Sequence, residues 1–88
     1  MSESGVLLGV ELVTPAERIW SGQAQMVSAR TVEGDLGILP GHEPLFGILV
    51  DGQVSIKAAD GVVTDFAVHG GFLSVSNNRV SILTESAG

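Results

Sequence analysis

The stretch that decides the fold covers residues 72–84 and reads Phe72-Leu73-Ser74-Val75-Ser76-Asn77-Asn78-Arg79-Val80-Ser81-Ile82-Leu83-Thr84. On both sides of Asn77-Asn78, apolar and polar residues alternate, as they do in strands that bury one face. Asparagine tolerates the positive φ that a tight hairpin turn requires. We therefore predict two antiparallel strands, residues 72–76 and 79–84, joined by a two-residue turn.

The same reasoning extends toward the N-terminus. Asp60-Gly61 is a hairpin signal between strands predicted at 53–57 and 62–68. No stretch shows a helical period over ten residues, and short strands separated by glycine are typical of an antiparallel sandwich or barrel. The remaining predicted segments are strands at 6–13, 19–21 and 25–31, a turn at 14–17, a loop at 33–37, an apolar segment at 45–50 and a frayed end at 86–88.

Length and charge exclude several classes of protein. The chain has 88 residues, so we expect one domain over 1–88 with its core within 6–85. Ten acidic residues against four basic ones argue against binding nucleic acid or an anionic lipid surface. Cysteine is absent, which excludes disulfides and thiolate metal sites. With no secretory signal or membrane span in the sequence, we expect a soluble protein on the cytoplasmic side.

Hydropathy points to a partner. Charged residues make up only 16% of the chain, and its mean hydropathy is +0.40. A domain this small cannot bury so much apolar surface alone, so part of that surface should contact another subunit. Trp20, the single tryptophan, can serve either the core or such a contact, and we favour the core.

Residues 31–45 hold the densest set of glycine, proline, acidic and histidine residues. A hydrolase could pair Asp35 with His42 and use Ser28 or Ser74 as nucleophile, but the chain has no Gly-x-Ser-x-Gly elbow. The stretch 34–37 is glycine-rich, but it has an acid where a phosphate would sit. A metal site is not supported by the spacing of the four residues that could form it, namely Asp35, His42, Glu43 and His69. His69 fits better as a strand-end residue with a hydrogen-bonded ring.

A protein-binding role fits these residues better. Glu33 and Asp35 offer two carboxylates on a rigid turn, which can accept bidentate hydrogen bonds from an arginine of a partner. Adjacent apolar residues would add contact area. These residues are Ile38, Leu39, Leu45 and Phe46, and we expect two of the first three to belong to the core instead.

With these residues the sequence resembles a known family, the ε subunit of bacterial F-type ATP synthases, which is called δ in mitochondria. The resemblance is to the N-terminal β-sandwich domain of that subunit. The resemblance covers residues 6–85. Four stretches carry it: Val10-Glu11-Leu12-Val13-Thr14-Pro15 with Arg18; Trp20-Ser21-Gly22; Glu33-Gly34-Asp35-Leu36-Gly37-Ile38-Leu39-Pro40-Gly41-His42-Glu43-Pro44-Leu45, the most specific; and Ala67-Val68-His69-Gly70-Gly71-Phe72-Leu73-Ser74-Val75 with Val80-Ser81-Ile82-Leu83.

The resemblance implies a fold and a role. The fold is all-β, two packed and mostly antiparallel sheets of about five strands each. The role is that of a non-catalytic rotor subunit in the central stalk, which joins the γ subunit to the polar loops of the c-ring during proton- or sodium-coupled ATP synthesis. By position, Glu33, Gly34 and Asp35 would meet the c-ring. The residues toward γ would be His42, Glu43, Pro44 and Leu45.

Family members usually continue into a C-terminal pair of helices that can inhibit ATP hydrolysis and in some members bind ATP. Because this sequence ends at Gly88, we expect no helical hairpin, no inhibitory arm and no nucleotide or other cofactor. The resemblance also implies a peripheral location on the cytoplasmic face of the inner membrane, within the synthase. The alternatives are a stand-alone β-sandwich that binds a small ligand and the hydrolase described above.

Overall fold

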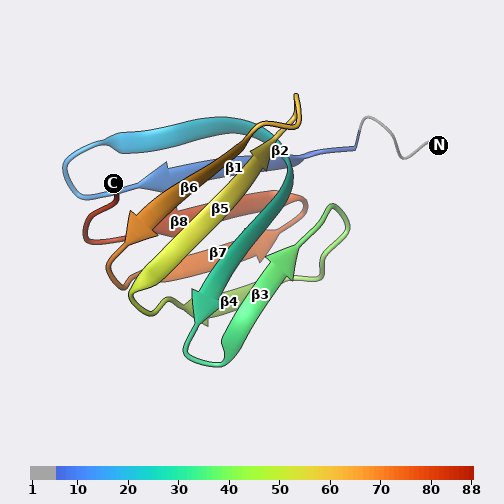
Figure 1. Cartoon of the computed structure of the whole chain (residues 1–88). Coiled ribbons are helices and arrows are strands. Elements are labelled where there is room, and N and C mark those ends of the chain that lie inside the picture. The colour runs from blue at the N-terminus through green and yellow to red at the C-terminus, as the bar shows by residue number, and fades with distance from the viewer. Residues whose placement is uncertain (1–5) are drawn as a thin grey trace.

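The computed structural model describes residues 6–88 as strands joined by turns and loops (Figure 1). Within this part of the chain there is no helix, and so none that is long and apolar enough to cross a membrane. The strands are β1 (Leu8–Val13), β2 (Arg18–Thr31), β3 (Gly34–Ile38), β4 (Leu45–Ile48), β5 (Gly52–Ala58), β6 (Val63–Val68), β7 (Phe72–Ser76) and β8 (Arg79–Leu83).

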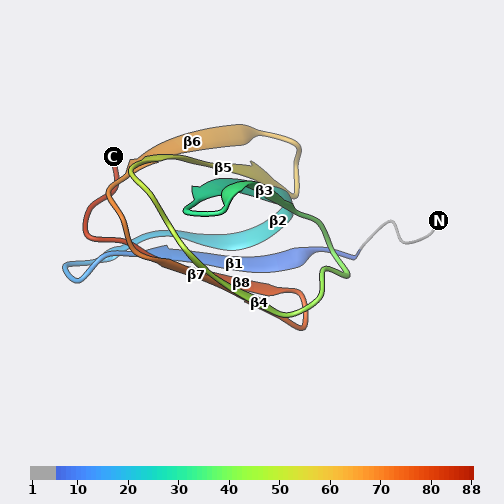
Figure 2. The same cartoon turned by 90° about the horizontal axis from the view of Figure 1, so that it is seen from below.

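The strands form two layers that face each other (Figure 2). One layer has the order β4-β7-β8-β1, the other contains β6, β5 and β3, and β2 takes part in both. Every pair is antiparallel except β1 with β8. The prediction of an all-β, mostly antiparallel sandwich is confirmed, with the two layers joined through β2 into one hydrogen-bonded sheet.

The core lies between the layers and is built from alternate positions of the strands. In β7, Leu73 and Val75 are buried while their neighbours are exposed, and β8 repeats the pattern with Val80 and Ile82. Trp20 packs partly buried against this core, as we favoured. The other buried apolar residues are Leu8, Val10, Leu12, Ala24, Val27, Ala29, Ile38, Leu49, Val54, Ile56 and Val68.

Both predicted hairpin turns are present. Asn77 and Asn78 have φ values of 51° and 60°, the left-handed region at both central positions that a type I′ turn requires. Gly61 has φ 91° in the turn between β5 and β6, where the carboxylate of Asp60 accepts the N–H of Val62 at 3.0 Å. These turns set the registers of the two hairpins.

The segments 19–21 and 25–31 were predicted as separate strands, and this was wrong. They are parts of one strand, β2, of 14 residues. Between Ala24 and Met26 its register against β5 shifts. Such a shift bends a strand and increases its twist, which lets β2 pair with β1 in one layer and with β5 and β3 in the other.

The prediction of a loop at residues 33–37 was also wrong. Most of this segment is β3, which pairs with the end of β2 from Thr31 opposite Gly34 to Val27 opposite Ile38. Glycine and aspartate have low strand propensity. Here an already formed neighbour supplies the hydrogen bonds, so tertiary context outweighs the local preference.

Two chain ends also differ from the predictions. The first strand begins at Leu8, two residues later than predicted. The end at residues 86–88 was expected to be frayed, but the structure places it against the edge of β6. Ala67 and Gly88 exchange two backbone hydrogen bonds of 2.9 and 3.0 Å, and Ala87 forms a bridge with Val68. Backbone pairing with an otherwise open edge therefore orders these last residues.

Candidate functional site

The turn between β2 and β3 presents the acidic residues of the site. The Thr31 hydroxyl accepts the N–H of Glu33 at 3.1 Å and donates to the carbonyl of Gly34 at 3.0 Å, which fixes the turn from within. Gly34 has φ 120°, a conformation that side-chain-bearing residues rarely adopt. Glu33, Gly34 and Asp35 are all exposed, so this turn offers a rigid surface to a partner.

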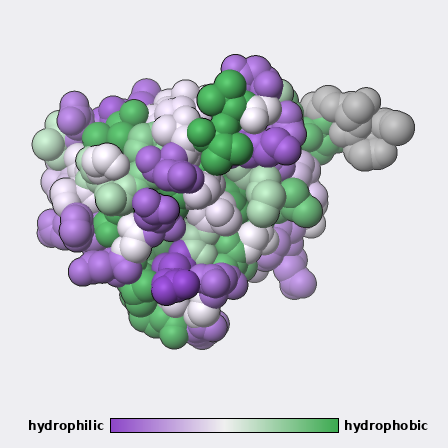
Figure 3. Space-filling view, viewed as in Figure 1, coloured by the Kyte–Doolittle hydropathy of each residue, from purple (hydrophilic) through white to green (hydrophobic). Residues whose placement is uncertain are grey.

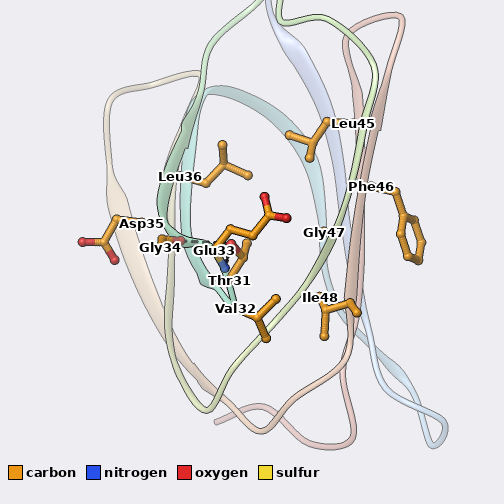
Figure 4. Close-up of a pocket in the computed structure, with 10 residues that line it drawn as sticks. All are labelled: Thr31, Val32, Glu33, Gly34, Asp35, Leu36, Leu45, Phe46, Gly47 and Ile48. Atoms are coloured by element: carbon orange, nitrogen blue, oxygen red, sulfur yellow. Dashed lines mark hydrogen bonds between the residues drawn. The ribbon is translucent and has the colours of Figure 1, made fainter.

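The two carboxylates differ in what they contact. Asp35 is held by Arg30, directly opposite on β2, with 2.9 Å between Arg30 Nε and Asp35 Oδ1. In Figure 4, Asp35 points away from the neighbouring pocket, whereas the Glu33 carboxylate extends over it. Among the described residues, no ion pair engages Glu33. Glu33 is therefore the carboxylate with both oxygens available to a partner.

A pocket of about 310 Å³ opens between the β2–β3 hairpin and β4 (Figure 4). One end is closed by the hydrogen bond from the N–H of Val32 to the carbonyl of Ile48, at 2.9 Å, and by the bridge of Thr31 with Leu49. Its lining combines apolar side chains with the acidic turn and Thr31, and the Glu33 carboxylate extends over it. The lining residues are Thr31, Val32, Glu33, Gly34, Asp35, Leu36, Leu45, Phe46, Gly47 and Ile48.

The pocket brings together only part of the predicted site. Leu45, predicted to face γ, lines the same pocket as the three residues predicted to face the c-ring. His42, Glu43 and Pro44 lie instead in the loop after β3, at the opposite end of that strand from Glu33 (Figure 1). His42 and Glu43 are thus separated from Glu33 by the length of β3, roughly 15 Å at about 3.4 Å per residue.

The residues considered for catalysis and metal binding have other neighbours. The Nδ1 of half-buried His42 lies 2.8 Å from the carbonyl oxygen of Glu43. His69 follows β6, as predicted for a strand-end residue. Its Nδ1 lies 4.0 Å from the nearest Asp51 oxygen, too far for a hydrogen bond, and no other residue that the structure describes hydrogen-bonds its ring. Within residues 6–88, no three histidine or acidic side chains converge as metal ligands would.

A row of exposed apolar side chains crosses the outer face of β4, β7 and β8. Ile48 pairs with Phe72, and Phe72 pairs with Leu83, so these three lie side by side across the strands. Phe46 lies two residues along β4, and its ring stacks on Phe72 with 5.4 Å between centroids. The exposed fractions of the four residues are 66% for Phe46, 48% for Ile48, 46% for Phe72 and 47% for Leu83. We call these four residues the apolar row.

The outer face of the other layer is polar by comparison. Arg30 pairs with Asp35 on β2 and β3, and the hydroxyl of Ser55 donates to Asp65 across β5 and β6. In Figure 3, hydrophilic side chains are spread over this face with smaller hydrophobic patches between them, and Val63 on β6 is 57% exposed. Exposed contiguous apolar surface on a small domain marks a contact with another protein. The apolar row on β4, β7 and β8 is therefore a candidate contact surface of the domain.

Sequence reasoning identified Phe46 as a contact residue but missed Ile48, Phe72 and Leu83. The alternation of inward and outward residues along β7 and β8 would have identified Phe72 and Leu83. Once Leu73 and Val75 point inward, Phe72 must point outward, and the same phase in β8 turns Leu83 outward. Of the three apolar residues of which two were expected in the core, Ile38 is buried, Leu45 packs partly buried against the core and Leu39 is 57% exposed.

Comparison with known proteins gives this geometry a context. The family model described as the β-sandwich domain of the ATP synthase delta/epsilon chain matches residues 7–88. The chain belongs to this family. As a delta/epsilon sandwich domain it resembles the ATP synthase epsilon chain of Rhodococcus erythropolis, with 57% identity over 79 residues that cover 89% of this chain and 65% of the relative.

Other relatives agree in name but differ in length. The ATP synthase epsilon chain of Streptomyces avermitilis is 50% identical over 91% of this chain, and the match covers 64% of that protein. The epsilon chain of Micrococcus luteus is also 50% identical over 91% of this chain, with 88% of that protein covered. The chain therefore spans about two thirds of the first relatives and most of the last.

Solved structures show the same fold in assemblies. A chain in the cryo-EM structure of the Euglena gracilis mitochondrial ATP synthase, which includes the c-ring, aligns with a TM-score of 0.89 and 27% identity, covering 94% of this chain and 53% of that one. A chain from the central stalk and c-ring of the Tetrahymena thermophila enzyme aligns with a TM-score of 0.78 at 24% identity, covering 92% and 65%. The second likeness establishes the fold alone.

Proposed function

We propose that this chain is a non-catalytic central-stalk subunit of an F-type ATP synthase, which couples the γ subunit to the c-ring while the rotor turns. It would bind peripherally on the cytoplasmic face of the inner membrane, as part of the complex. The observation that carries the proposal is an exposed apolar row on β4, β7 and β8 beside an exposed acidic turn, the two meeting at the pocket that Phe46, Ile48 and Glu33 line.

The apolar row is the surface we assign to γ. Its four side chains are 46–66% exposed although they lie in register on neighbouring strands. Removing such area from water stabilises a complex by about 25 cal/mol per Å². The predicted γ residues His42, Glu43, Pro44 and Leu45 lead directly into Phe46, so the loop and the row form one continuous surface along the chain.

The acidic turn is the surface we assign to the c-ring, whose loops carry an arginine in the family that the chain resembles. Glu33 presents an exposed carboxylate at the tip of the turn, and Gly34 keeps the backbone beside it open. Asp35 already forms an ion pair with Arg30, so it should bind an arginine of the ring more weakly than Glu33 does. Pairs of this kind set orientation and register more than affinity.

Coupling also needs a stiff body between the two contacts. The sandwich supplies this because β2 runs through both layers and its hydrogen bonds continue from one sheet into the other. Each contact can therefore transmit force without the layers sliding apart. Each interface should bury about 1,000 Å² or more to be specific.

The ring assignment is tested by reversing charge at the turn. Glu33→Arg and Asp35→Arg are introduced separately, with Glu17→Arg as a control because Glu17 is an equally exposed acid in the turn before β2. Each variant is reconstituted with γ and the c-ring, and ion-coupled ATP synthesis is measured. Glu33→Arg should impair coupling more than Asp35→Arg, and Glu17→Arg should have no effect. Normal synthesis in both turn variants would refute the assignment.

A further inference from the structure

The turn between β7 and β8 forms hydrogen bonds with two segments outside its own hairpin. Asn77 and Asn78 both adopt positive φ, but they differ in what they bind. The side-chain oxygen of Asn78 accepts the N–H of Gly41 at 2.7 Å, and its backbone carbonyl accepts the N–H of Gly9 at 2.8 Å. One residue thus joins the β7–β8 turn, the start of β1 and the loop after β3.

The loop over residues 39–44 contains a tight turn whose geometry leaves one backbone N–H group to be bound from outside. The N–H of His42 donates to the carbonyl of Leu39 at 3.1 Å. Pro40 and Gly41, with Gly41 at φ 90°, take the two central positions, as in a type II turn. This turn leaves the N–H of Gly41 without an internal partner, and that is the group that Asn78 accepts.

Few other hydrogen bonds hold the loop in place. Figures 1 and 2 both place it beside the β7–β8 turn, away from the body of either layer. Among the described residues, the bond to Asn78 is the one hydrogen bond that connects residues 39–44 with another segment. The loop begins after buried Ile38 and ends at partly buried Leu45, and between them this bond is the hydrogen bond that fixes its middle to the rest of the domain.

We propose that Asn78 is a positioning residue, whose side-chain oxygen fixes the loop over residues 39–44 and thereby the direction in which His42 and Glu43 meet a partner. The identity of that partner as γ rests on the function proposed above. Ordering a loop before binding reduces the entropy lost on association. The turn itself needs only two residues that accept positive φ, so the requirement for asparagine at position 78 comes from the loop.

The chain offers matched variants for a test. Asn78→Gly keeps the left-handed backbone and removes the acceptor, whereas Asn78→Asp keeps an acceptor oxygen. Asn77→Gly makes the same change in the same turn at a residue that, among those described, has no hydrogen bond to the loop. Amide hydrogen exchange at the four loop residues that are not proline, measured by NMR on the 88-residue chain, reports the tether directly, above all at the N–H of Gly41. Exchange in the loop should rise roughly two- to tenfold in Asn78→Gly and stay near wild type in the other two variants.

Two results would overturn the inference at this stage: loop exchange that is unchanged in Asn78→Gly, or a rise of equal size in Asn77→Gly, which would reflect a weaker hairpin. The binding of purified γ then tests the role in docking. The dissociation constant should rise by a similar factor in Asn78→Gly only, and a loosened loop with unchanged affinity would overturn that role. If even the wild-type chain fails to bind γ, the proposed function fails, while the exchange data still decide whether Asn78 positions the loop.

Discussion

Replacing Phe46 by serine should weaken binding to γ strongly while leaving the domain folded. Phe46 is the most exposed member of the apolar row, with 66% of its surface in contact with solvent. A phenylalanine side chain contributes about 200 Å², so complete coverage by a partner would remove about 130 Å² from water. At about 25 cal/mol per Å² this amounts to about 3 kcal/mol, or a roughly 100-fold change in the dissociation constant.

The cost to the isolated domain should be much smaller. Phe46 contributes to the fold through its stacking on Phe72, with 5.4 Å between ring centroids. Such a pair is worth about 0.5–1.5 kcal/mol beyond its buried area. Chemical denaturation should therefore show a loss of free energy of unfolding within about that range, and the circular dichroism of the folded state should be unchanged.

Isothermal titration with purified γ measures the binding. Val63→Ser is the matched control, because Val63 is 57% exposed in β6, in the layer without the apolar row. We expect the dissociation constant to rise between about 10- and 100-fold for Phe46→Ser and to stay unchanged for Val63→Ser. Wild-type affinity in Phe46→Ser, or an equal loss in both variants, would show that the apolar row is not the docking surface.

Three further predictions concern the fold. Thr84→Val should lower the free energy of unfolding by about 1–3 kcal/mol, seen in denaturant melts, because the buried Thr84 hydroxyl donates to the carbonyl of Gly70 at 2.8 Å; unchanged stability would contradict this. Gly71→Ala should prevent folding, because a methyl group there would overlap the backbone of β8. Gly70→Ala should fold, since its methyl group meets no atom within 4 Å. Equal yields of folded protein from the two variants would contradict this packing. A double-mutant cycle on Arg30 and Asp35 should give a coupling below about 1 kcal/mol, because the two side chains are 63% and 77% exposed; a larger value would mean that the pair holds β3 in place.

Local sequence pattern predicted the hairpins well. Residues 53–57 and 72–76 alternate cleanly, and the turns at Asp60-Gly61 and Asn77-Asn78 have the residue types that positive φ demands. In these segments the side chains, the turn chemistry and the neighbour in sequence all favour the same structure. Agreement of this kind makes a strand predictable without knowledge of the rest of the fold.

Segments whose pairing is set by distant residues were not predictable in this way. The glycines of β3 weaken its local preference for a strand, and it forms because β2 presents a free edge beside it. Gly22 and the register shift between Ala24 and Met26 interrupt the alternation of β2, which hides its continuity. The ordered end at residues 86–88 likewise depends on the edge of β6.

The candidate site was predicted in part. The exposure of Glu33 and Asp35 agrees with a turn that faces a partner, and their contact with the c-ring stays a prediction. The ion pair that distinguishes them required knowledge that Arg30 lies opposite Asp35. The role of Asn78 could not be foreseen, because its partner Gly41 is 37 residues away in sequence.

The parallel pairing of β1 with β8 has a consequence for synthesis of the protein. β1 lies between β2 and β8, and Val10 pairs with Val80, far along the chain. During translation, one edge of β1 therefore stays unpaired until β8 has left the ribosome. An open strand edge can pair with other chains, so the nascent protein is exposed to aggregation for as long as β8 is missing.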